Sequence, residues 1–182
     1  MKATGIVRRV DELGRLVIPK EIRRTMRLAE GTPLEIFTDR EGQIILKKYS
    51  PMMELGSFAK QYAESVAQTM NQKVAVSDRD QIIAVAGGGK RELLGKTISR
   101  QLEEMIINRE NSIQAGLDKK TIPLISGDED SYSAQATYPI CCEGDCIGAV
   151  ILYSRENQTH FSETEYKAAA CAASFLGKQM EG

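Results

Sequence analysis

Histidine, tryptophan and long apolar runs are scarce in this 182-residue sequence, which has one histidine and no tryptophan. His160 alone leaves no convincing Ser-His-Asp or Cys-His arrangement, because both need an imidazole beside a nucleophile. The apolar stretches 148–153 and 168–176 are far too short to span a bilayer. These absences predict a protein that is not an enzyme, has no catalytic residues or cofactor, and contacts no membrane.

The four cysteines lack the spacing of a disulfide framework, and the N-terminus is charged from its second residue. Without the apolar run of an export signal, we expect a cytoplasmic protein with reduced thiols. Cys141, Cys142 and Cys146 could suggest zinc, but they do not have the spacing of a Cys-x-x-Cys knuckle. We therefore predict no metal, and strand cysteines that act as small hydrophobic side chains.

The charge is divided unevenly along the chain, although the net charge is only −1. Residues 1–50 hold eleven of the 24 basic residues and seven of the 25 acidic residues, which gives +4 there and −5 in the rest. Such asymmetry favours a basic part that binds a polyanion and an acidic part that does not.

Residues 1–50 have the pattern of two hairpins around one short helix. We predict strands at 4–10 and 15–18, a helix at 20–28 that follows Pro19 and buries Ile22 and Met26, and strands at 32–38 and 43–48. A unit of about fifty residues is close to the size at which a lone core is marginal. Strands with open edges invite pairing with a second copy, so we predict an intertwined dimer.

Arginines dominate the basic part and are placed to meet an anion. Arg8 lies at a strand end, Arg15 follows a turn, and Arg23 and Arg24 lie on the exposed face of the helix. A guanidinium contacts phosphate oxygens and guanine edges in a bidentate manner. Two copies of these four arginines would neutralise up to about eight phosphates, with a log–log salt slope of roughly −7. The predicted DNA-binding residues are Arg8, Arg9, Arg15, Arg23, Arg24, Lys2 and Lys20.

After a linker at 51–55, residues 56–182 have the pattern of an α+β domain. The elements run helix, two strands, helix, two strands, helix: 55–70, 73–76, 81–86, 98–106, 134–142, 146–154 and 162–180. Ser162 and Glu165 form a capping box at the start of the last helix. The helices 55–70 and 162–180 either belong to the core or pair between subunits. If each domain pairs with a different neighbour, the protein is a homotetramer, whereas one common partner gives only a dimer.

Two other segments have weaker functional alternatives. Gly87–Lys90 is similar to a phosphate-binding loop, but Ala84 replaces the first glycine and Arg91 replaces the serine or threonine. A flexible turn is the better interpretation. Residues 116–133 form a long loop with an acidic run at 128–130, which is either a solvated tip or a lid over a pocket.

Residues 4–25, TGIVRRVDELGRLVIPKEIRRT, followed by LEIF at 34–37 and IILKKY at 44–49, closely resemble the AbrB family of transition-state regulators. The resemblance implies a swapped-hairpin β-barrel dimer that binds double-stranded DNA, with contacts from Arg8, Arg15, Arg23 and Arg24. Residues 56–180 look like a GAF domain, on the segments Tyr-Pro-Ile at 138–140 and Gly-Ala-Val-Ile-Leu-Tyr at 148–153. GAF domains commonly bind small molecules, so the resemblance leaves open that this domain binds a ligand, which the sequence does not identify.

The combination of the two domains is similar to that of a sporulation regulator, which implies a role as activator and repressor of late sporulation genes. Two alternatives differ in class. One is an antitoxin-like DNA-binding protein, although its tail would be disordered, whereas residues 56–182 have the periodicity of a folded domain. The other is mainly a small-molecule sensor whose basic part only dimerises.

Overall fold

The computed structural model describes residues 4–49, 56–115, 121–128, 132–156 and 159–181. The chain divides into two compact units, Met1–Tyr49 and Ser50–Gly182. Lys2, the predicted linker at 51–55 and positions 129–130 of the acidic run lie outside the described residues. Within the described part of the chain, no helix is both long and apolar enough to cross a membrane.

The N-terminal unit contains one short helix and one hairpin, α1 (Lys20–Thr25), β1 (Leu34–Thr38) and β2 (Ile44–Lys48). The two strands pair antiparallel in a register that sets Leu34 opposite Lys48. The turn between them is held by Asp39, whose Oδ1 accepts hydrogen bonds from the backbone N–H groups of Glu41 and Gln43 at 3.0 and 2.8 Å. The Asp39 carboxylate therefore stabilises this tight turn by accepting backbone hydrogen bonds.

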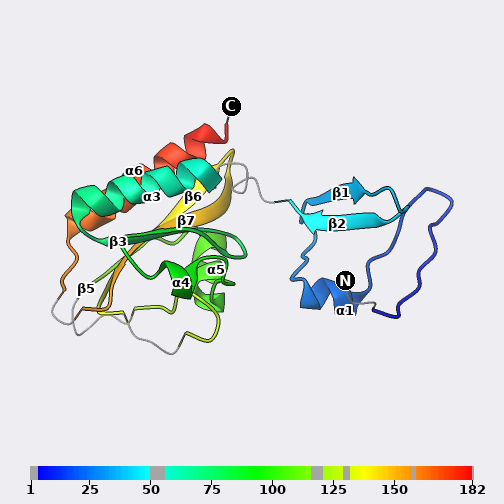
Figure 1. Ribbon diagram of the computed structural model, residues 1–182, viewed down its shortest axis with the longest axis horizontal. Coiled ribbons are helices and arrows are strands. Elements are labelled where there is room, and N and C mark those ends of the chain that lie inside the picture. Colours follow the sequence, from blue (N-terminus) through cyan, green and yellow to red (C-terminus); the bar gives the residue numbers. More distant parts are fainter. Residues whose placement is uncertain (1–3, 50–55, 116–120, 129–131, 157–158, 182) are drawn as a thin grey trace. The chain divides into compact units, whose positions relative to one another are not determined.

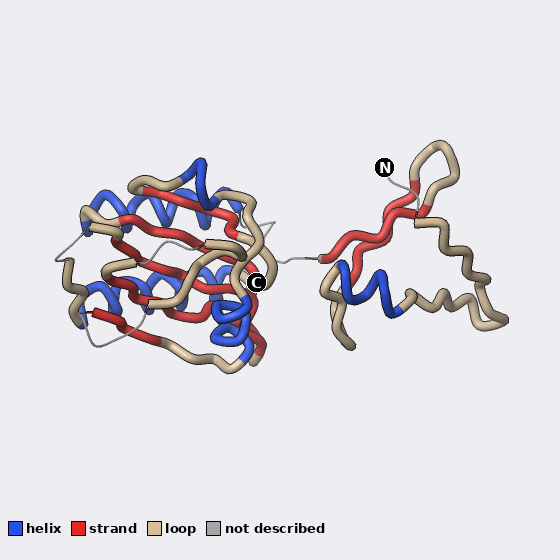
Figure 2. The backbone as a smooth tube through the Cα atoms, turned by 90° about the horizontal axis from the view of Figure 1, so that it is seen from below, coloured by secondary structure: helices blue, strands red, loops and turns tan. Residues whose placement is uncertain are grey.

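The predicted strands at 4–10 and 15–18 are wrong for the single chain, in which residues 4–19 form no strand (Figure 2). The turn between them is present, since the N–H of Gly14 donates to the carbonyl oxygen of Asp11 at 2.9 Å. The flanking residues alternate as a strand would, but a strand needs a ladder partner, and β1 and β2 pair only with each other. Within the described single chain, the alternating pattern alone is therefore not sufficient to form a strand.

The C-terminal unit is built on a five-stranded antiparallel sheet in the order β4-β3-β7-β6-β5 (Figure 1). The strands are β3 (Lys73–Asp78), β4 (Ile82–Ala86), β5 (Ser112–Ala115), β6 (Ala134–Cys142) and β7 (Asp145–Ser154). The helices α3 (Gly56–Met70) and α6 (Glu163–Gln179) cover one face, and α4 (Lys90–Leu93) and α5 (Arg100–Ile107) lie on the other. This arrangement has two cores.

The two cores differ in the size of their side chains. Under α3 and α6 the buried helix residues are mostly alanines, which lets the helices approach the sheet closely: Ala59, Ala63, Ala67, Ala169, Ala172 and Ala173. Under α4 and α5 the core is made of larger side chains that are fully buried, including Leu93, Ile98, Leu102, Ile106, Leu124 and Ile151. Interiors packed in this way contain few voids larger than a water molecule.

Several sequence predictions can be compared with these elements. The capping box at Ser162 and Glu165 is confirmed, and β6 has the predicted bounds. The helix α4 and the strand β5 were missed, because four residues are too few to show a hydrophobic period. Part of the long loop is ordered, since Ile125 forms a β-bridge with Ile98.

The prediction for the cysteines was wrong for two of them, because Cys141 and Cys146 form a disulfide. Their Cα atoms are directly opposed across the β6–β7 hairpin, 4.0 Å apart. A separation of five residues does not suit a zinc knuckle, but it does suit opposed positions on either side of a tight turn. Cys142 and Cys171 are free thiols.

Candidate nucleic-acid interface

Three of the predicted DNA-binding side chains lie on the short helix α1. Lys20 begins the helix, and Arg23 and Arg24 are in its last turn. All three are exposed. Ile22 between them is only half-buried and Met26 is 42% exposed, so the predicted burial of these two side chains is wrong for the single chain. The helix therefore presents its basic side chains to solvent and its apolar side chain to the unit.

Arg15 lies on the turn of residues 11–14 and is held by Asp11. Its Nε donates to Asp11 Oδ2 at 2.7 Å, while Asp11 Oδ1 accepts from the N–H groups of Leu13 and Arg15. Hydrogen bonds from the Arg15 backbone and then from its side chain lower the pKa of Asp11. Asp11 thus fixes both the turn and the direction of the guanidinium.

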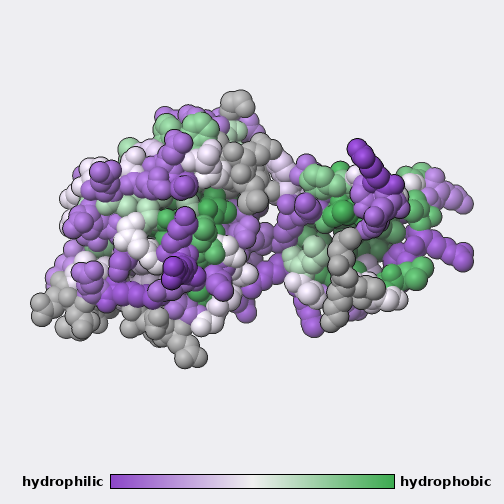
Figure 3. Space-filling view, in the orientation of Figure 1, coloured by the Kyte–Doolittle hydropathy of each residue, from purple (hydrophilic) through white to green (hydrophobic). Residues whose placement is uncertain are grey.

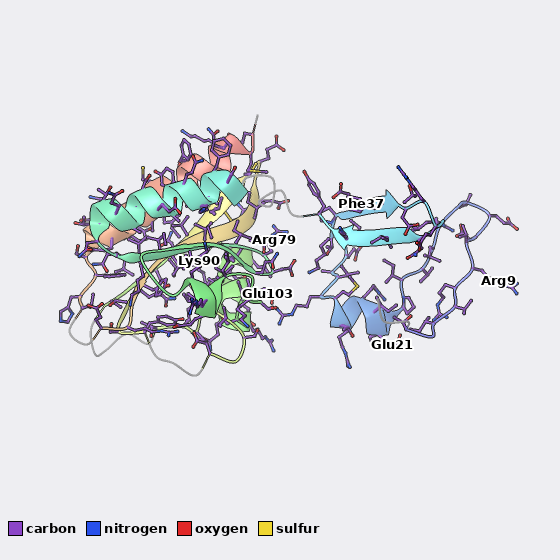
Figure 4. All side chains as sticks on the ribbon, viewed as in Figure 1. Arg9, Glu21, Phe37, Arg79, Lys90 and Glu103 are labelled. Atoms are coloured by element: carbon purple, nitrogen blue, oxygen red, sulfur yellow. A yellow bond between two sulfur atoms is a disulfide. The ribbon has the colours of Figure 1, made fainter. Side chains whose placement is uncertain are left out.

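Arg8 and Arg9 lie on the segment before this turn, and both are exposed. The Arg8 guanidinium donates to the carbonyl oxygen of Val7 at 3.0 Å, and Figure 4 shows Arg9 on the outer edge of the segment. The structure therefore brings Lys20, Arg23 and Arg24 onto one helix, and it leaves Arg8, Arg9 and Arg15 on the segment 4–19.

An apolar cavity of about 440 Å³ opens beside these basic residues. It is lined by Ile6, Val7, Arg8, Leu16, Val17, Ile18, Pro19, Ile22, Met26, Leu28, Leu34 and Leu46. Several of these side chains are exposed, with Val7 at 82% and Val17 at 71%, and hydrophobic surface is visible over this unit in Figure 3. Sequence reasoning missed the cavity, although the alternation of Val7 and Leu16 with arginines was a signal for it.

The glycine run after β4 is a close-packed turn. All three glycines have positive φ, at 75°, 132° and 77°. A Cβ at Gly87 would collide with the carbonyl oxygen of Gln72, and one at Gly89 would meet the hydroxyl of Tyr153. The Tyr153 hydroxyl also donates to the carbonyl oxygen of Gly88 at 3.1 Å. The run is therefore a turn, as predicted, and packing against Gln72 and Tyr153 explains its glycines.

An ionic network fixes the described part of the long loop. Arg155 donates to Glu92 at 2.8 Å and to the Tyr132 hydroxyl at 3.3 Å, and that hydroxyl donates to Asp128 at 2.5 Å. Burial first, and then the hydrogen bond to Asp128, raises the pKa of Tyr132. The Asp128 side chain is only 6% exposed, so this position is not a solvated tip.

Comparison with known proteins agrees with these two units. Residues 54–181 match the family model described as stage V sporulation protein T C-terminal, transcription factor. Stage V sporulation protein T of Bacillus subtilis (strain 168) is 50% identical over 181 residues, which cover 100% of this chain and 99% of that protein. This chain belongs to the stage V sporulation protein T family.

The N-terminal unit has further relatives of its own. The transition state regulatory protein AbrB of Bacillus subtilis is 66% identical over 53 residues, or 29% of this chain and 54% of that protein. Residues 7–53 also match a model described as antidote-toxin recognition MazE, bacterial antitoxin. The AbrB resemblance of the N-terminal residues is therefore confirmed.

The C-terminal unit has the fold of a GAF domain. The GAF domain of an Acinetobacter phosphoenolpyruvate-protein phosphotransferase superposes with a TM-score of 0.57 at 13% identity, covering 74% of this chain and 84% of that one. At this identity the likeness concerns the fold alone. The predicted α+β class, with an AbrB-like and a GAF-like part, is confirmed, and the chain is a transcription regulator of a sporulation family.

Proposed function

We propose that the protein binds double-stranded DNA as a dimer formed through residues 1–50, and that it activates some late sporulation genes and represses others. The observation that carries this proposal is the open apolar cavity beside a set of exposed arginines. In this proposal, apolar side chains of a second copy fill the cavity, and the arginines bind the phosphate groups of DNA.

The apolar exposure of the N-terminal unit supports the dimer. Val7, Leu16 and Val17 line the cavity and are each at least half exposed in the single chain. Removing contiguous apolar surface from water is favourable, so covering this cavity would stabilise the unit. The segment 4–19 alternates as a strand but lacks a ladder partner, so a second copy supplies both the strand and the apolar cover.

The charges of the same unit support DNA as the ligand. Arg23 and Arg24 project from α1, and Arg15 is oriented by Asp11. Together with Arg8, Arg9, Lys20 and Lys2, they give each dimer two sets of side chains for phosphate and base contacts. We assign these seven residues as the DNA-binding set.

The salt dependence of operator binding tests this assignment. Arg23→Ala with Arg24→Ala removes four guanidinium groups from a dimer, which should flatten the log–log salt slope by about 3 to 4 and weaken binding. Arg40→Ala, in the exposed turn between β1 and β2, is the matched control and should leave the slope almost unchanged. Equal slopes for all three proteins would contradict the assignment.

We further propose that α3 and α6 pair with the same helices of another subunit, so that two dimers form a tetramer. Tyr62 and Phe175 stack with ring centroids 5.0 Å apart, and Phe58 and Phe175 remain 47% and 39% exposed. Exposed aromatic side chains on two adjacent helices are typical of helical subunit interfaces. An isologous contact between copies would cover them.

Light scattering of the intact protein tests the tetramer. Four chains of 20.1 kDa give a particle of about 80 kDa. Phe58→Glu with Phe175→Glu should yield a dimer, whereas Ile107→Glu, at a position 62% exposed on α5, should stay tetrameric. A dimer of the unsubstituted protein would overturn the tetramer without affecting the DNA-binding proposal.

Packing under α4 and α5 disfavours a ligand enclosed on that side of the sheet. Among the described residues, this space is filled by Leu93, Leu102 and Leu124, all at most 1% exposed. The antitoxin alternative is disfavoured because the C-terminal residues form a folded sheet domain instead of an extended tail.

A further inference from the structure

The β6–β7 hairpin ends in a disulfide whose two cysteines differ in accessibility. Cys141 is exposed, whereas Cys146 is only 3% exposed. The bond closes a ring that contains only the tight turn at 142–145. A disulfide constrains the unfolded chain less when its ring is small, so this bond contributes less to global stability than one that closes a long loop.

Two arginines from other elements hold the turn inside this ring. Arg79, in the turn between β3 and β4 and labelled in Figure 4, donates from Nε to the carbonyl oxygen of Cys146 at 2.5 Å. Arg109, which follows α5, donates to the carbonyl oxygen of Gly144. Hydrogen bonds from charged donors are stronger than neutral ones, so the turn is held in place from outside the hairpin.

The helix α6 rests directly on the same hairpin end. Gly177 packs so closely on Cys141 that a Cβ at this position would collide with the Cys141 carbonyl oxygen. Gly177 is itself buried, and α6 packs along β6 at this point. A change in the backbone at Cys141 therefore reaches the last turns of α6 through backbone contact alone.

The neighbouring thiol of Cys142 is less suited to thiol–disulfide exchange. Burial first, and then the charges of Glu143 and Glu181, raises the pKa of the Cys142 thiol. A thiol with a raised pKa forms less of the reactive thiolate. Cys142 also pairs with Asp145 in the ladder, whereas Cys141 pairs with Cys146.

We propose that Cys141 and Cys146 are a reversible thiol–disulfide site that exchanges with small-molecule disulfides. The redox state of this site controls the local stability of the C-terminal end of α6. In the oxidising direction, the Cys141 thiolate attacks one sulfur of the small disulfide, forms a mixed disulfide and releases one thiolate. The Cys146 thiolate then attacks Cys141 Sγ and releases the second thiolate. Two protein thiols are oxidised, one small disulfide is reduced to two thiols, and the two protons go to the released thiolates.

Equilibration of the full chain with mixtures of reduced and oxidised glutathione tests the exchange. After the free thiols are alkylated, mass spectrometry of the peptide that contains Cys141, Cys142 and Cys146 should show one transition from three labels to one as the oxidised fraction rises. In the double variant Cys142→Ser with Cys171→Ser, the same transition should run from two labels to none. A bond from Cys146 to Cys142, or a peptide that stays reduced in oxidised glutathione, would overturn the site.

Two further measurements separate the mechanism from simple oxidation. Cys146→Ser should stop at the first step and retain one glutathione on Cys141. Amide hydrogen exchange near Gly177 should become several-fold faster on reduction, while exchange in β3 should stay unchanged. Equal exchange rates near Gly177 in the oxidised and the reduced protein would contradict the proposed coupling between the disulfide and α6. The site goes beyond DNA binding, so loss of operator binding in other variants does not bear on it.

Discussion

The two units of this chain differ in how far each is complete by itself. Among the described residues 4–49, Pro19 alone is buried, while Val7 and Leu13 are 82% and 74% exposed. In the C-terminal unit Ile151 and Leu152 are fully buried in two cores on opposite faces of one sheet. One sequence thus contains a unit whose core is closed within the chain and another whose apolar side chains stay exposed in the single chain.

The first helix of the chain and the last one show the same difference. The helix α6 begins at Ser162, whose hydroxyl and partner Glu165 satisfy the first backbone N–H groups. The helix α1 begins after Pro19, which makes no side-chain cap hydrogen bond. A helix of six residues without a cap depends on tertiary packing, and in this unit the packing surface is still open.

The largest effect is expected from a charge placed in the open cavity. Val17→Asp should raise the dissociation constant of the dimer at least about a hundredfold, since an unpaired carboxylate in an apolar interface costs several kcal/mol. Operator binding should be lost with the dimer. Sedimentation equilibrium of the full chain and a binding titration measure both quantities.

Ile44→Asp is the matched control for this variant. Ile44 is 72% exposed, against 71% for Val17, but it does not line the cavity. It should change the dissociation constant much less. Similar losses in both variants would mean that apolar exposure alone, and not the cavity, explains pairing.

The next effect is expected when a substitution creates a cavity in the core of the C-terminal unit. Leu152→Ala should lower the free energy of unfolding of this unit by about 2–5 kcal/mol, because Leu152 is fully buried. Hydrogen exchange within β3 and β7 of the full chain reports it without interference from the N-terminal unit. Leu94→Ala, at a position 40% exposed, should cost much less, and equal costs would contradict the packing described for the sheet.

Alkaline pH should weaken the closed unit through Tyr153. Burial, the largest cause, raises the pKa of Tyr153 to about 12. The unfolded chain therefore loses the phenol proton first, and the free energy of unfolding falls as pH rises from 10 to 12. The expected loss is about 2 kcal/mol. Tyr153→Phe should be less sensitive over this range in denaturant titrations, and an equal sensitivity would assign the loss to other groups.

The smallest effect is expected at the cap of α6. Ser162→Ala removes one half of the capping box and should cost about 1 kcal/mol. The amides of the first turn of α6 should exchange faster, while those of β6 stay protected. Thr164→Ala, in the same turn but outside the cap, is the control, and a loss as large as that of Ser162→Ala would exclude the cap as its cause.

The sequence predicted well those elements whose signals lie within the chain. The turn at 143–145 specified the end of β6, and Ser162 with Glu165 specified the start of α6, because turns and capping are local properties. It could not give the disulfide, since Cys141 and Cys146 become neighbours only through the register of the hairpin. It also missed the network of Arg155 with Tyr132 and Asp128, which joins separate segments of the chain.

The N-terminal unit shows a different limit. The arginines could be chosen from the sequence because residue type and local charge identify candidates for a polyanion. The strands predicted at 4–10 and 15–18 are absent from the single chain, although their pattern alternates, because no strand of the described unit pairs with them. The cavity was missed because its lining joins segments that lie apart in the sequence, such as Leu16 and Leu46, and the alternation around Val7 and Leu16 alone does not show that they meet.

Amide hydrogen exchange of the intact protein over residues 6–10 and 15–18 tests the central claim most directly. In the single chain these residues form no strand, so their amides would exchange at close to the rates of an unfolded peptide. If a second copy completes the unit, they should be strongly protected, and Val17→Asp should abolish that protection. Rapid exchange in the unsubstituted protein, at concentrations where it binds its operator, would contradict the account.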